Sequence, residues 1–159
     1  MSLNTVINIV KGWPSPYIVE ASLPVDETVA NGLGQGDIVT ISDDRKWKLG
    51  AASVNATPYI INVDSTDPST GRSAHKAGYL QVPWGNVQGL GLNNALEIET
   101  ANYTADASIA IGTPLSAPTG KLQKAVAGQV VVGVVTKAPY TLGHFTYLTF
   151  IAEDGKRVA

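Results

Sequence analysis

Short runs in which apolar and polar residues alternate recur along this sequence and constrain its fold more than any other feature. They are separated by turn-forming residues, and the chain holds 16 glycines and 9 prolines among 159 residues. Alternation with a period of two places successive side chains on opposite faces of a strand. Strands are therefore predicted over residues 6–10, 17–22, 37–42, 46–49, 59–63, 95–103, 113–116, 121–125, 130–136 and 147–151. Only residues 26–33 could hold a helical turn or two, with Asp26 as N-cap.

This pattern predicts an all-β fold, a small β-barrel or sandwich built from short antiparallel strands. A chain of this length can bury a stable core without disulfides, and it contains no cysteine. We expect an extended N-terminal arm and proline-rich linker over residues 1–16. A single β domain follows over residues 17–159, with a long loop region at about 64–94. The run VVVGVVT (130–136) is expected to be a central, covered strand, in which Gly133 marks a bulge or a close backbone approach.

The N-terminal segment is the first candidate interaction site. Residues 6–10 (VINIV) are mostly apolar, and the segment WPSP (13–16) separates them from the rest of the chain. An arm of this kind can add a strand to the sheet of a neighbouring chain, which is β-augmentation. The alternative is that residues 6–10 form the first strand of the chain's own barrel. The candidate contact residues are Val6, Ile7, Ile9, Val10 and Trp13.

Two segments far apart in the sequence share a similar pattern. They are GDIVTISDDRKWKLG (36–50) and GTPLSAPTGKLQKA (112–125). Each begins with glycine, runs through an apolar residue followed by Ser or Thr, crosses a polar turn and resumes with lysine and a large apolar residue. The pattern indicates either an internal duplication or an ordinary β-meander, which also repeats strand and turn.

No group of residues in the sequence points to catalysis or metal binding. His75 and His144 lie in unrelated turn-like contexts, and no metal-ligand spacing of His or Cys occurs. Glu97 and Glu99 share one strand face, which suits a solvated surface better than a pair of glycosidase carboxylates. We therefore expect a protein that is not an enzyme and that uses no cofactor or metal.

Charge and hydropathy narrow the range of partners. The net charge is −2 and the sequence pI is about 5.6, with basic residues scattered, which argues against nucleic-acid binding. No apolar run approaches the ~20 residues that span a bilayer, and the first residues lack the features of a signal peptide. We expect no membrane partner and synthesis in the cytoplasm. Trp84 either caps the core from a loop or, with Tyr79, forms a contact with another subunit or partner.

A sequence resemblance to a known protein family indicates a function. The residues AIGTPL (110–115), GKL (120–122), VVGVVT (131–136) and YLTFIA (147–152) form a sequence pattern. It resembles the C-terminal half of head-decoration proteins of tailed bacteriophages, also called capsid cement proteins. Residues 20–49 resemble the opening β half of the same family.

This resemblance implies a compact, β-tulip-like domain on the outside of a virion. It would form a homotrimer, bridge subunits of the major capsid protein and be made in the host cytoplasm. The alternatives are another phage structural β domain, in a tail or fibre, and a carbohydrate-binding module that uses Tyr79 and Trp84.

Overall fold

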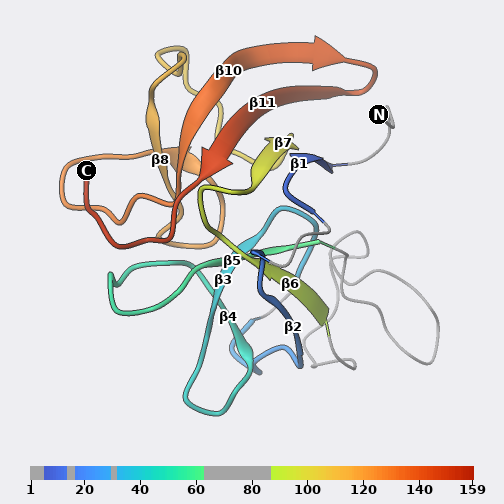
Figure 1. Ribbon diagram of the computed structural model, residues 1–159, viewed down its shortest axis with the longest axis vertical. Coiled ribbons are helices and arrows are strands. Elements are labelled where there is room, and N and C mark those ends of the chain that lie inside the picture. Colours follow the sequence, from blue (N-terminus) through green and yellow to red (C-terminus); the bar gives the residue numbers. More distant parts are fainter. Residues whose placement is uncertain (1–5, 14–16, 30–31, 63–86) are drawn as a thin grey trace.

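A computed structural model describes residues 6–13, 17–29, 32–62 and 87–159 (Figure 1), and the structural statements that follow concern these residues. They form strands and no helix, which confirms the all-β prediction. The strands are β1 (Ile7–Lys11), β2 (Glu20–Leu23), β3 (Ile38–Ile41), β4 (Trp47–Leu49), β5 (Tyr59–Ile61), β6 (Val87–Gly91), β7 (Glu97–Thr100), β8 (Pro114–Ser116), β9 (Gln123–Lys124), β10 (Gly133–Leu142) and β11 (Phe145–Ala152).

The strands form two antiparallel sheets that lie one above the other in Figure 1. The six-stranded sheet has the order β1-β7-β11-β10-β8-β9, and the five-stranded sheet has the order β2-β6-β5-β3-β4. Both contribute to one core, in which Ile38 and Leu90 of the smaller sheet join Ile98 and Phe150 of the larger one. The end strands of the sheets do not pair with each other within the described ranges, so of the two predicted forms the fold is sandwich-like and not a closed barrel.

The N-terminal segment is part of the domain and not a free arm. Strand β1 pairs with β7 at the edge of the six-stranded sheet, with Asn8 opposite Glu99. Ile7 is buried in the core. The structure therefore has the second of the two alternatives, a first strand in the chain's own sheet, because pairing with β7 buries the apolar side of residues 7–11.

The sequence pattern did not predict strand β6, which lies inside the expected loop region 64–94. It is an interior strand of the five-stranded sheet, between β2 and β5. Gly89 and Gly91 interrupt its apolar pattern, and the space that a Cβ of Gly89 would need is filled by the ring of Trp47. The rest of that loop region, residues 64–86, falls outside the described residues.

Two other local predictions have definite outcomes. Asp26 begins a turn and not a helix, since its Oδ1 accepts hydrogen bonds from the backbone and hydroxyl of Thr28. Gly133 does mark a close approach, because a Cβ there would overlap the ring of Phe150. Strand β10 is covered on one face only, with Val134 partly exposed on the other.

The two sheets repeat one arrangement of five strands. Adding five to each strand number in β2-β6-β5-β3-β4 gives β7-β11-β10-β8-β9, which is the larger sheet without β1. We call β2–β6 the first repeat and β7–β11 the second repeat. The two similar sequence segments form the equivalent hairpins, β3–β4 and β8–β9, and each is followed by a strand that pairs with its first member.

Backbone hydrogen bonds repeat in the same register. Several backbone bonds of the first repeat have a counterpart in the second at equivalent residues, including bonds outside the strands. The matched bonds are Gly36 N to Ile61 O (2.9 Å) with Gly112 N to Val135 O (2.8 Å), Asp26 N to Trp47 O (3.0 Å) with Thr104 N to Leu122 O (2.7 Å), Gly91 N to Val19 O (2.7 Å) with Ala152 N to Leu96 O (2.9 Å), and Leu92 N to Pro58 O (2.9 Å) with Glu153 N to Val132 O (2.8 Å). A generic meander does not require these irregular bonds to agree, so the structure favours an internal duplication.

Side-chain sizes compensate between the repeats. Trp47 and Leu122 are equivalent, and so are Gly89 and Phe150. The first repeat thus has the large Trp47 on β4 and Gly89 on its last strand, β6. The second repeat has the smaller Leu122 just before β9 and Phe150 on its last strand, β11. All three non-glycine side chains are fully buried. Exchange of volume between two core positions is how close-packed interiors tolerate sequence change.

Candidate functional site

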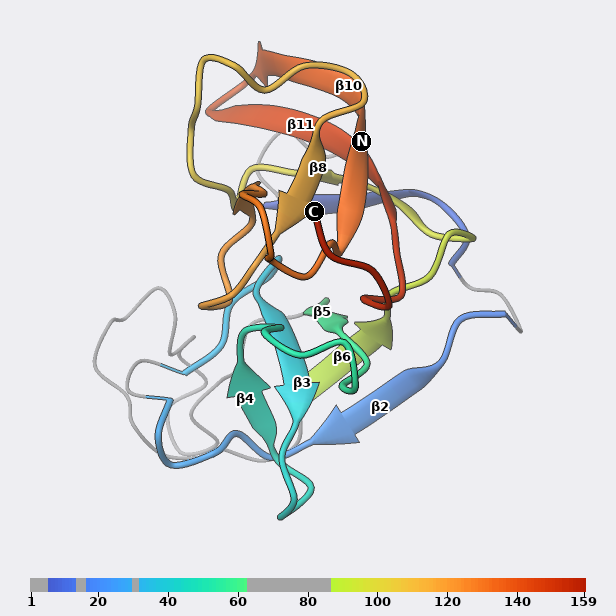
Figure 2. The same cartoon turned by 90° about the vertical axis from the view of Figure 1, so that its left-hand side faces the viewer.

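One side of the molecule is formed by the chain before β3. Strand β1 pairs with β7, and β2 pairs with β6. Between them, the side-chain amide of Asn93 donates to the Tyr17 carbonyl at 2.8 Å, and Gly91 N donates to the Val19 carbonyl. Residues 7–11 thus run antiparallel to β7 in the larger sheet, and residues 20–23 run antiparallel to β6 in the smaller one. We call residues 7–13 and 17–23 the edge strip (Figure 2).

The edge strip exposes three large apolar side chains. Val10 is 52 % exposed, Tyr17 77 % and Val19 61 %. Isolated exposed apolar residues are common on protein surfaces. Val10 lies on edge strand β1, and Tyr17 and Val19 lie just before edge strand β2. These three side chains within ten residues form the strongest candidate for a protein-binding surface in the described part of the chain.

The residues predicted as contacts behave differently from one another. Val10 is exposed, whereas Ile7 is buried in the core. Val6, Ile9 and Trp13 are partly buried and pack against that core. The two other candidates, Tyr79 and Trp84, lie outside the described residues.

Tyr17 and Val19 were missed as candidate contacts because both fall in the run over residues 17–22 that was predicted as a strand. Both precede β2, where the backbone is held by the Asn93 and Gly91 bonds and the side chains are left exposed. The aromatic residue beside the prolines at 14 and 16 was the available signal, since tyrosine is common in protein interfaces.

Glu97 and Glu99 lie on the outer face of the larger sheet, away from the core. Glu99 is only 3 % exposed, and its Oε1 accepts a hydrogen bond of 3.0 Å from the Asn8 side chain. Glu97 Oε2 accepts one of 2.9 Å from Thr136. The expectation of a fully solvated pair is therefore wrong for Glu99, and both carboxylates bind neighbouring strands.

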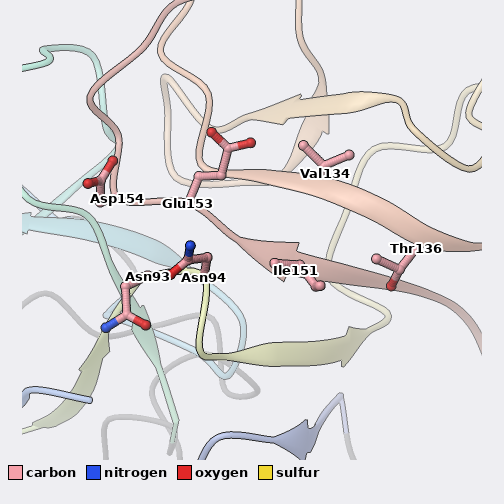
Figure 3. Close-up of a pocket in the computed structure, with 7 residues that line it drawn as sticks. All are labelled: Asn93, Asn94, Val134, Thr136, Ile151, Glu153 and Asp154. Carbon is pink, nitrogen blue, oxygen red and sulfur yellow. The ribbon is translucent and has the colours of Figure 1, made fainter. Parts of the chain in front are cut away.

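A shallow pocket of about 440 Å³ lies on the same outer face (Figure 3). Val134 and Ile151 supply its apolar part, and its polar part comes from the loops around β7 and after β11. The full lining is Asn93, Asn94, Val134, Thr136, Ile151, Glu153 and Asp154. Glu153 is bound by Arg157 through two hydrogen bonds of 2.7 and 2.8 Å, so this carboxylate is already neutralised.

The duplication explains the apolar floor of this pocket. Val134 and Ile151 are equivalent to Ile60 and Leu90 of the first repeat. Those two side chains are fully buried, because the back of the first repeat packs against the core of the second. The back of the second repeat has no such cover within the described residues, and its floor is partly exposed.

Other kinds of site find no support in the described residues. No group of three His, Asp or Glu side chains in these ranges could hold a metal ion. His144 is exposed in the turn between β10 and β11, and His75 lies outside the described residues. Within residues 6–13, 17–29, 32–62 and 87–159, no helix is long and apolar enough to cross a membrane.

Comparisons with models of protein families, with curated proteins and with solved structures find no match to this chain.

Proposed function

We propose that this chain is a structural protein of a tailed-phage virion. In this proposal it binds the outside of the capsid as a homotrimer and stabilises the shell by bridging subunits of the major capsid protein. The observation that carries the proposal is the edge strip, with Val10 exposed on edge strand β1 and Tyr17 and Val19 exposed just before edge strand β2. The sequence resemblance supplies the identity of the partner.

The residues that carry the resemblance in the second repeat lie in the turn before β8, the β8–β9 hairpin, the start of β10 and most of β11. Residues 20–49, which resemble the opening half of the same family, overlap the edge strip at residues 20–23. The three exposed apolar residues of the edge strip, Val10, Tyr17 and Val19, lie outside both resembling segments.

Binding of this kind stabilises a shell by mass action. Burying a large apolar side chain contributes about 1.5–3 kcal/mol. A protein that binds only the expanded shell stabilises it by about 2.7 kcal/mol when its free concentration is 100 times the Kd. No catalysis is needed for this function.

The test is co-sedimentation of the purified protein with expanded phage capsids, alongside its native mass by light scattering. We expect a trimer that pellets with capsids. The double variant Tyr17→Ser/Val19→Ser should stay folded, because both side chains are exposed, and should no longer pellet. The matched control is Ile111→Ser, which removes an equally exposed apolar side chain from the loop before β8.

Two results would overturn the proposal. One is wild-type protein that stays in the supernatant at capsid concentrations that saturate known binders, and the other is a double variant that pellets like the control. Binding to tails or fibres instead of heads would favour the alternative phage role. Deletion of residues 1–11 is a poor test, because it removes Ile7 from the core and exposes the edge of β7.

A further inference from the structure

The two repeats differ at one edge. Strand β7 is flanked by β11 on one side and by β1 on the other. The equivalent strand of the first repeat, β2, is flanked by β6 on one side only, and no described strand pairs with its outer edge. Figure 2 shows β2 at the margin of the molecule, with β6 on its inner side. Among the described residues, the first repeat therefore has no counterpart of β1.

The register shows which backbone groups face outward on β2. Gly91 N donates to the Val19 carbonyl, so residues of odd number in this segment bond to β6. Because antiparallel ladders alternate, the N–H and C=O groups of Glu20 and Ser22 point away from β6. These are four backbone groups on the outer edge of the strand.

The same alternation holds in the second repeat, where the outward groups are used. Glu97 and Glu99 are the equivalents of Glu20 and Ser22. Leu96 bonds to β11 through Ala152, so Glu97 and Glu99 face β1. In the second repeat, the outward backbone groups of β7 thus pair with an added antiparallel strand, β1.

We propose that the outer edge of β2 is a docking site for an extended segment of a partner protein. The segment adds antiparallel to the five-stranded sheet, in the place that β1 takes in the six-stranded sheet. Unpaired strand edges accept such segments through backbone hydrogen bonds, and side chains give the specificity. The inference holds whichever assembly the chain joins, so it does not depend on the capsid proposal.

Strand β1 indicates the chemistry of the segment. Lys11 lies opposite Glu97, and Asn8 lies opposite Glu99 and donates to its carboxylate. By equivalence, the segment places Lys or Arg opposite Glu20 and a small polar residue opposite Ser22. Glu20 is exposed and negatively charged, so it attracts a basic residue and disfavours an acidic one.

The position opposite Ala21 completes the pattern. Its equivalent in the second repeat is Ile98, which lies opposite Ile9 of β1. Ala21 is smaller and packs against the core of the first repeat, so there is room for an apolar residue of the segment. Val19, next along the strip, adds exposed apolar surface.

The probe is a blocked synthetic peptide with the sequence of residues 6–12, VINIVKG, added to the full-length protein at up to millimolar concentration. Amide hydrogen exchange, read by NMR, is expected to slow at Glu20 and Ser22 and to stay unchanged at Lys48, which lies on the opposite edge strand of the same sheet. A peptide with Lys replaced by Glu should bind several-fold more weakly. The Glu20→Lys variant should reverse that preference.

Two variants separate docking from folding. Ser22→Pro removes an outward N–H and leaves the ladder to β6 intact, which an edge strand tolerates. It should unfold at the same denaturant concentration as wild type and lose peptide binding. The matched control Ser22→Ala keeps the N–H and should bind normally.

Four results would overturn the proposal: no binding of the peptide, equal binding by Ser22→Pro, protection on β4 or β7 instead of β2, and loss of a native oligomer in Ser22→Pro. The last would assign the edge to a second copy of this chain.

Discussion

The contact between Trp47 and Gly89 gives the sharpest test of how this core is built. The Trp47 side chain is fully buried, and its Nε1 donates a 2.8 Å hydrogen bond to the Val87 carbonyl. A Cβ at Gly89 would lie 2.7 Å from Cζ2 and 2.9 Å from Cη2 of the indole. The perturbation is Gly89→Ala, which adds a single methyl group at this contact.

The expected cost follows from the overlap. Carbon atoms pack best at about 3.5–4.0 Å, so the new methyl would intrude by roughly 1 Å. The indole cannot move away freely, since the hydrogen bond and the ring of Tyr59, at 5.1 Å between centroids, hold it in place. Overpacking of this kind typically costs about 1–3 kcal/mol, so we expect Gly89→Ala to lower the free energy of unfolding by that amount.

The second repeat suggests how to remove the clash. At the position equivalent to Trp47 it has Leu122, and there the last strand carries a large residue. Trp47→Leu alone should cost roughly 2–5 kcal/mol, from the cavity and the lost hydrogen bond. In the double variant Trp47→Leu/Gly89→Ala the methyl fills part of that cavity. The double variant should therefore be more stable than the sum of the single effects by about 1–3 kcal/mol.

Guanidinium unfolding of the four proteins at 25 °C, followed by circular dichroism, measures this coupling. Circular dichroism is preferable to fluorescence because one tryptophan is itself replaced. Additive effects within about 0.5 kcal/mol would refute the reasoning, since neighbours that compete for one volume cannot act independently. Gly91→Ala is the control. Its Cβ would come no closer than 3.3 Å to another atom, so it should be far less costly than Gly89→Ala.

Two further predictions concern polar contacts. Asn102 donates a 2.9 Å hydrogen bond to the buried Asp37 carboxylate and so links the two repeats. Asn102→Ala should therefore lower the free energy of unfolding, measured in guanidinium, by about 1.5–3 kcal/mol. A loss under about 0.5 kcal/mol would contradict this role. The hydroxyl and backbone N–H of Ser108 donate to Asp106 and hold the pKa of that carboxyl below its usual value. A depressed pKa in the folded state gives stability that is present above the unfolded pKa and is lost as the pH falls through the folded one. Ser108→Ala should raise the pKa of Asp106 in an NMR titration, and an unchanged pKa would show that the side-chain bond is not its main cause.

Much of this fold was predictable from local pattern, and the failures have nonlocal causes. Nearly every run with a period of two became a strand, because alternation reflects one buried face and needs no knowledge of the partner. Strand β6 was missed because its glycines break the apolar pattern, and the space beside Gly89 is filled by Trp47, more than forty residues away. Strand β1 has the same nonlocal dependence. The sequence of residues 7–11 predicts a strand but does not show whether that strand pairs with its own chain or with a neighbouring one.

The candidate site was less predictable than the fold. Apolar residues of the N-terminal segment were identified as contacts, yet Ile7 packs into the core while Val10, three residues later, is exposed. Alternation places Val10 on the face opposite to Ile7, and only the pairing with β7 decides which face is buried. The carbonyls of Tyr17 and Val19 are bound by the Asn93 side chain and by the backbone of Gly91, which are again distant in sequence.

The duplication indicates where to look for function in such a chain. Where the repeats agree, as in the turn at Gly36 and the turn at Gly112, the agreement is explained by folding alone. Where the repeats differ, a surface that is covered in one repeat is exposed at the equivalent place in the other. The second repeat covers the back of the first and has β1 along β7, so the uncovered equivalents are the back of the second repeat and the outer edge of β2. On the back, the chain's own side chains bind the polar groups, since Thr136 donates to Glu97 and Asn8 donates to Glu99. Among the described residues, nothing pairs with the outer edge of β2, and the most exposed apolar residues of the edge strip lie beside it. Of the two uncovered surfaces, the edge is therefore the one still suited to a partner.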